Sequence, residues 1–118
     1  MDLVIAWAKA FLLTVLVEIP IASFALRRDD RSVSRRAVLV FFASLATHPA
    51  VWFIFPRLPL TYPEMILAAE TWAVVIEGVF YAFVFRGVEP WRAAGISLLA
   101  NGSSFGFGLL VRAYTGWV

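Results

Sequence analysis

Four long apolar stretches, separated by short polar segments, restrict how this chain can fold more than any other feature. Each is close to the roughly 20 residues that a helix needs to cross a bilayer. Hydrophobic residues make up 62% of the 118-residue chain, against roughly 45–50% in typical globular domains. A soluble domain of this size could not bury so much apolar surface. The stretches cover residues 3–26, 37–55, 63–85 and 91–111.

The sequence therefore predicts an all-α fold, with residues 1–118 forming a single four-helix transmembrane domain. Short connections make sequential helices neighbours, so we expect an integral membrane four-helix bundle with antiparallel, up-down topology. The lipid bilayer is then the first expected partner of the chain.

The basic residues predict an orientation. Seven of the ten Lys and Arg residues lie in segments 27–36 and 86–92, and cytoplasmic loops of membrane proteins carry an excess of such residues. We therefore expect both segments in the cytoplasm and both chain termini in the periplasm, for a protein of a bacterial inner membrane. Segment 27–36 also contains Asp29 and Asp30, which weaken its interpretation as a patch for anionic lipid. We expect no nucleic-acid partner.

Ionisable residues inside the apolar stretches are the strongest indication of function. Glu70 and Glu77 lie seven residues apart in the third stretch, so they are separated by only about 20° around a helix axis. Tyr81 lies one turn further along the same face. Glu18 and His48 lie inside the first and second stretches. Such groups are costly in a membrane unless they are paired or neutral, and they usually mark functional sites.

The depths of these groups agree with a common site. Counted from the cytoplasmic ends at about 1.5 Å per residue, one strong polar group of each stretch falls roughly 12–16 Å deep. That is near the middle of a hydrocarbon core about 30 Å thick. The sequence predicts an ion or proton site made of Glu18, His48, Glu70, Glu77 and Asn101, supported by Ser44, Thr47, Tyr81 and Ser104.

Smaller polar and glycine residues favour helix packing. Hydroxyl side chains inside membrane helices commonly serve only as hydrogen bonds between helices. We favour that simple role for Ser44, Thr47, Ser97 and Ser104. The GxxxG spacing of Gly102 and Gly106 predicts that the fourth stretch approaches another helix closely along that face.

The residue types leave the identity of the bound species open. Crowded carboxyl groups can share protons and pass them on. A divalent metal would instead neutralise the carboxylates, with Glu18, His48 and Glu77 as its candidate ligands. No HExxH or ExxH spacing is present to name a metal. Because the chain has no cysteine, thiolate metal sites and c-type haem attachment are excluded.

Three classes of function remain open. The first, which we favour, is a membrane protein that binds or translocates a proton or divalent cation, with Pro20 and Pro49 allowing the helices to rearrange. The second is an intramembrane metal-dependent or acid/base enzyme, with a Glu as general base and His48 as acid or ligand. The third is an accessory subunit of a larger membrane complex, in which His48 ligates a haem or pigment. Under all three we expect a homo-oligomer or a partner membrane subunit.

The predicted orientation can be tested with fusions at the C-terminus. Alkaline phosphatase fused there should be active, because that enzyme needs the periplasm, and green fluorescent protein should stay dark. A cytoplasmic signal from both reporters would mean that the orientation or the number of spans is wrong.

Overall fold

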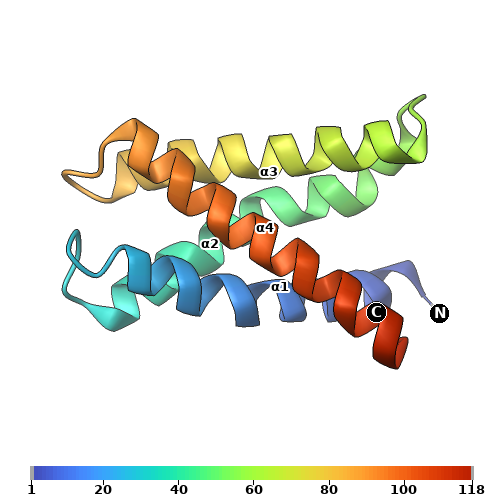
Figure 1. Cartoon of the computed structure of the whole chain (residues 1–118), viewed down its shortest axis with the longest axis horizontal. Coiled ribbons are helices and arrows are strands. Elements are labelled where there is room, and N and C mark those ends of the chain that lie inside the picture. Colours follow the sequence, from blue (N-terminus) through green and yellow to red (C-terminus); the bar gives the residue numbers. More distant parts are fainter. Residues whose placement is uncertain (1, 118) are drawn as a thin grey trace.

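The computed structural model describes residues 2–117, and within that range it is all-helical. The predicted helical class is confirmed, and all four α-helices are long and apolar enough to cross a membrane, which suggests a membrane protein. Residues 1 and 118, the ends of the predicted domain, lie outside the described residues. The elements are α1 (Leu3–Ala25), α2 (Val33–Phe53), the short 3-10 helix η1 (Phe55–Arg57), α3 (Tyr62–Val84) and α4 (Pro90–Thr115), as Figure 1 shows.

Helix α2 begins one turn earlier than predicted. Ser32 caps it, and its hydroxyl accepts a hydrogen bond from the backbone N–H of Arg35 at 3.1 Å. The Asp30 side chain in turn accepts from the backbone N–H of Ser32 at 2.9 Å. The last residues of the predicted Arg-rich loop are therefore helical. The prediction placed the boundary where charge ends, whereas the capping residues place it at Val33.

The four helices form a ring in which each packs against two others. Helix α1 contacts α2 and α4, and α3 contacts the same two helices. Within residues 2–117, α1 does not pack on α3 and α2 does not pack on α4. In Figure 1 the α1–α2 and α3–α4 connections lie at one end of the molecule, and the α2–α3 connection lies at the other. This arrangement is consistent with a four-helix bundle.

The apolar core fills one half of the bundle. Its buried residues come from the second halves of α1 and α3, the first halves of α2 and α4, and the α1–α2 and α3–α4 connections beside them. We call this set the apolar cluster: Ala22, Leu26, Val40, Ala43, Tyr81, Phe85, Val88, Ala93, Ile96 and Ala100.

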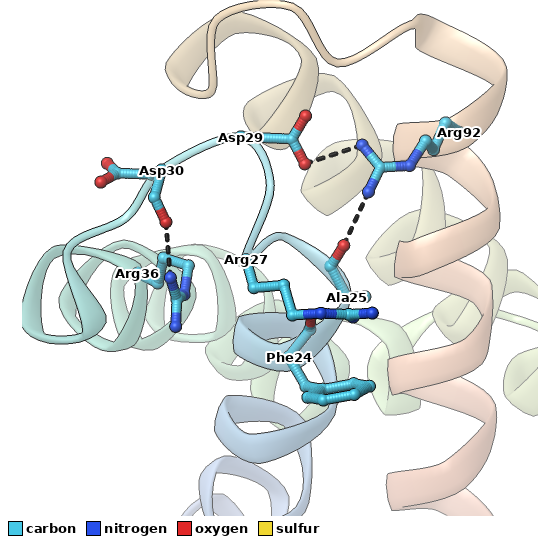
Figure 2. A network of polar contacts seen from close by, with 7 residues as sticks. All are labelled: Phe24, Ala25, Arg27, Asp29, Asp30, Arg36 and Arg92. Atoms are coloured by element: carbon cyan, nitrogen blue, oxygen red, sulfur yellow. Dashed lines mark hydrogen bonds and ion pairs between the residues drawn. The ribbon is translucent and has the colours of Figure 1, made fainter.

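A polar network closes the same end of the bundle (Figure 2). Arg92 of α4 donates through Nη1 to the Asp29 carboxylate and through Nη2 to the backbone carbonyl of Ala25, both at 2.7 Å. Arg36 of α2 donates to the backbone carbonyl of Asp30 at 2.5 Å. Arg92 thus satisfies a carbonyl in the last turn of α1, where helices lack internal partners. Two arginines counted as topology signals therefore also hold helix ends together.

The predicted GxxxG contact is wrong, and the close approach lies elsewhere. A Cβ built on Gly102 or Gly106 would meet nothing within 4 Å. A Cβ on Gly78 of α3 would lie 3.4 Å from the Cα of Ala94 and 3.7 Å from the Cβ of Ser97 on α4. Helix α4 packs along the face that contains Ser97, and Gly102 is exposed. The spacing of two glycines did not indicate which face of the helix is buried.

The substitution Gly78→Leu should destabilise the bundle, because it forces a bulky side chain into the α3–α4 contact, at a cost of about 1–3 kcal/mol. Gly102→Leu adds the same atoms to an exposed position and should have little effect. Thermal unfolding of the two purified variants in detergent checks this. Equal destabilisation by both would show that the α3–α4 contact is misplaced.

Candidate functional site

Two carboxyl groups are buried in the middle of the ring. Glu18 lies on α1 with 0% of its surface exposed, and Glu77 lies on α3 with 1% exposed. Although these helices do not pack on each other, the two carboxyl groups are near enough for their charges to interact. The structure therefore brings together two of the predicted site residues from non-adjacent helices.

Helix α2 provides one hydroxyl to each carboxyl group. Ser44 Oγ donates to Glu18 Oε2 at 3.0 Å, and Thr47 Oγ1 donates to Glu77 Oε2 at 3.1 Å. The second oxygens, Glu18 Oε1 and Glu77 Oε1, are buried without a hydrogen-bond partner among residues 2–117. The sequence favoured these hydroxyls as simple links between helices. They do link α1, α2 and α3, but they do so through the carboxyl groups themselves.

The Thr47 hydroxyl can serve Glu77 in either protonation state. Besides Glu77 Oε2, its oxygen lies 3.2 Å from the Ser44 carbonyl and 3.4 Å from the Ala43 carbonyl. A hydroxyl has one hydrogen to donate and lone pairs to accept with. An ionised Glu77 can accept that hydrogen. A protonated Glu77 can donate to Thr47 Oγ1, which then turns its hydrogen to a backbone carbonyl.

Helix α4 closes the remaining side of the site. Asn101 lies beside Glu77, and Ser104 lies beside Glu18. The Asn101 amide nitrogen donates to the Ser97 carbonyl at 2.9 Å and is 3.3 Å from Ser97 Oγ, which fixes the amide along its own helix. All four helices therefore contribute polar groups around the two carboxyls.

His48 is placed differently from the prediction. Its Nε2 lies 3.2 Å from the Thr14 hydroxyl, and its Nδ1 is buried without a partner among residues 2–117. The imidazole lies 5.4 Å from the Phe11 ring and 6.5 Å from the Trp52 ring, centroid to centroid. The early start of α2 explains the difference, because it moves His48 about one turn, or roughly 6 Å, along the axis. Ser44 occupies the level where His48 was expected.

The predicted metal ligands do not form a metal centre. Across residues 2–117, no group of three or more His, Cys, Asp or Glu side chains could hold a metal ion. The set of Glu18, His48 and Glu77 is therefore not assembled, since the imidazole is directed to Thr14 and not to a carboxyl group.

Tyr81 lies at the boundary between the site and the apolar cluster. It is fully buried, near Glu77 and Glu18, and its hydroxyl has no partner within the described chain. It is one turn from Glu77 on α3, as the sequence predicted, and it belongs to the apolar cluster. Tyr81 therefore belongs to the apolar cluster and also lies near the carboxyl pair.

A cavity of about 560 Å³ joins these groups. Of the predicted site residues, only Tyr81 is not part of its lining. Sequence reasoning missed Thr14, Arg57 and Arg112, which also line the cavity. Neither arginine lies within a predicted cluster, so only the fold brings them to the cavity. The predicted residues in the lining are Glu18, Ser44, Thr47, His48, Glu70, Glu77, Asn101 and Ser104.

The cavity extends toward one end of the bundle only. From the two carboxyl groups it reaches Leu3 at the start of α1, Arg57 in η1, Tyr62 at the start of α3 and Arg112 near the end of α4. These residues are all exposed. The apolar cluster occupies the other half, so the carboxyl pair forms the floor of this chamber, and the exposed residues form its mouth.

No protein-family model, curated protein or solved structure matches this chain. The fold and the site define a class nonetheless: a four-helix protein with span-length helices and a buried carboxyl pair at the floor of a cavity. Its function has to be argued from the chemistry of that site.

Because the chain contains no cysteine, single introduced thiols can map the chamber. Ala73 lines the cavity with 5% exposure, and Ala43 lies in the apolar cluster with 1%. A small water-soluble thiol reagent should modify Ala73→Cys in the folded protein and leave Ala43→Cys unmodified, while both react after unfolding. Equal reactivity in the folded state would mean that the chamber has no single closed end.

Proposed function

We propose that the protein is an integral membrane protein that binds a proton or another small cation at the Glu18–Glu77 pair and translocates it. The main observation in support is that both carboxyl groups are almost fully buried, and each has one oxygen without a hydrogen-bond partner among residues 2–117. Burying an unpaired carboxylate costs several kcal/mol, on the order of the whole stability of a small domain. Two such groups in one site favour a bound positive charge, either a proton or a cation.

The span-length helices support placement in a bilayer. Large apolar side chains face outward, including Phe83 at 86% exposure and Leu67 at 71%. With the Arg-rich segments in the cytoplasm, the bundle has an antiparallel, up-down topology and both termini lie in the periplasm of a bacterial inner membrane. The mouth of the chamber then faces the periplasm, where Tyr62 and Tyr114 supply interfacial aromatic rings.

A proton or monovalent cation suits the site better than a divalent metal. The described residues hold no group of three or more metal-ligating side chains. The Thr47 hydroxyl lies within reach of a carboxyl oxygen and two backbone carbonyls, so it can reorient when Glu77 gains or loses a proton. The enzyme hypothesis has less support, because it assigned the acid or ligand role to His48, whose Nε2 lies 3.2 Å from the Thr14 hydroxyl and not beside a carboxyl group.

Translocation also needs access from the second side, which the apolar cluster blocks in this conformation. We therefore retain the expectation of a homo-oligomer or partner membrane subunit, whose contacts would favour a second conformation.

Proton flux into proteoliposomes tests the proposal. With a potassium diffusion potential as the driving force and a pH-sensitive dye inside, the wild-type protein should acidify the lumen. Glu77→Gln and Glu18→Gln should reduce that flux to the level of empty liposomes, because the amide side chain of Gln cannot release a proton near neutral pH.

Glu64→Gln is the matched control, since Glu64 is an exposed residue in the first turn of α3. Its flux should equal that of the wild type. The same assay with sodium or potassium gradients distinguishes a cation from a proton. Undiminished flux in both carboxyl variants, with any of these ions, contradicts the proposal.

A further inference from the structure

The cavity above the carboxyl pair is larger than a bare ion requires. Its volume of about 560 Å³ falls within the roughly 300–1,000 Å³ of sites that bind small organic molecules. A proton or a small inorganic cation needs only a few oxygen atoms around it. The space between the floor and the mouth therefore points to a ligand that has a sizeable apolar part, its body, as well as a charge.

The walls of the cavity are suited to an apolar body. Between the carboxyl pair and the mouth, the lining consists mainly of aliphatic and aromatic side chains from all four helices. Sites of this kind use apolar walls for affinity and a few polar groups for orientation. Aromatic rings add attraction for a cation that lies over their faces. These apolar wall residues include Leu13, Trp52, Met65, Ile66 and Phe105.

The floor of the cavity is suited to a positive charge. Glu18 Oε1 and Glu77 Oε1 are buried acceptors without a partner in the described chain, and both residues line the cavity. A cationic group placed between them would neutralise the pair, as opposite charges do for carboxylates in low dielectric. The basic residues at the mouth, Arg57 and Arg112, are exposed to water, where salt screens their repulsion of a cation.

We propose that the chamber binds a lipophilic organic cation, an ammonium or phosphonium centre with an aromatic or aliphatic body. The charged centre lies at the Glu18–Glu77 floor and the body lies against Trp52 and Phe105. This inference rests on the proposed function, since it names the cation of the same site. Because protons and the organic cation compete for the same carboxyl oxygens, binding of one releases the other.

Equilibrium dialysis of radiolabelled tetraphenylphosphonium tests this on the full chain in detergent, with protein-free micelles as the blank. The wild type should bind the probe saturably and release protons into weakly buffered solution as it does so. Tetraphenylborate, an anion of the same shape, should not bind above the blank. Equal binding of both ions would reduce the cavity to an apolar space without charge selectivity and would overturn the proposal.

Variants locate the two halves of the ligand. Glu77→Gln and Glu18→Gln should weaken tetraphenylphosphonium binding at least about tenfold, the equivalent of about 1.4 kcal/mol. Glu64→Gln should bind as the wild type does. Trp52→Ala and Phe105→Ala leave the carboxyl pair intact, so they keep the test valid if a carboxyl variant fails to fold. Both aromatic variants should also bind tetraphenylphosphonium more weakly. Unchanged affinity in both variants would show that the ligand does not contact these walls.

The outcomes separate this inference from the proposed function. If proton or sodium flux in proteoliposomes depends on Glu77 but tetraphenylphosphonium does not bind, the proposed function stands and the organic cation is wrong. If neither the flux nor the probe depends on the carboxyl pair, both are wrong.

Discussion

The burial of two carboxyl groups in one small bundle is the constraint on which the rest of the structure depends. Neither Glu18 nor Glu77 has an ion-pair partner among residues 2–117; each has one hydroxyl from α2 instead. Each hydroxyl bonds to one oxygen of its carboxyl group and leaves the other oxygen free to accept. The site can therefore still bind a ligand at a place that a salt bridge would have filled. The helices on which the two residues lie do not pack on each other, and hydroxyls of α2 link both carboxyl groups.

The open half of the bundle depends on the closed half. Alanines of the apolar cluster and Gly78 let the helices approach closely near the α1–α2 and α3–α4 connections. Arg92 ties the end of α1 to the start of α4 at the same end (Figure 2). Close packing and a polar clamp at one end allow the helices to leave a chamber at the other end without losing their arrangement. The contrast between the packed end and the open end places the carboxyl pair at the junction of the two halves.

The sequence predicts this architecture well and the details of the site less well. Helix existence follows from apolar length, and α1 and α3 end within one residue of the prediction. The error of one turn in α2 came from treating residues 33–36 as loop because of Arg35 and Arg36, whereas the Ser32 cap starts the helix at Val33. That error exchanged the levels of Ser44 and His48. The failure at Gly102 and Gly106 has a different cause: a short spacing motif carries no information about which face of a helix meets a neighbour, and only the packed bundle supplies it.

The two prolines bear on how the proposed translocation would reach the second side of a membrane. Both helices continue through their prolines, Pro20 in α1 and Pro49 in α2. Proline has no N–H, so the carbonyl four residues earlier loses its helical hydrogen bond and the helix bends more easily there. Pro20 follows Glu18 by two residues, and Pro49 follows Thr47 by two. A bend at Pro20 would move Ala22 and Leu26 of the apolar cluster relative to Glu18, and a bend at Pro49 would move the chamber wall at Trp52 relative to Ser44. The most deformable points of α1 and α2 therefore lie where a change of access would have to begin.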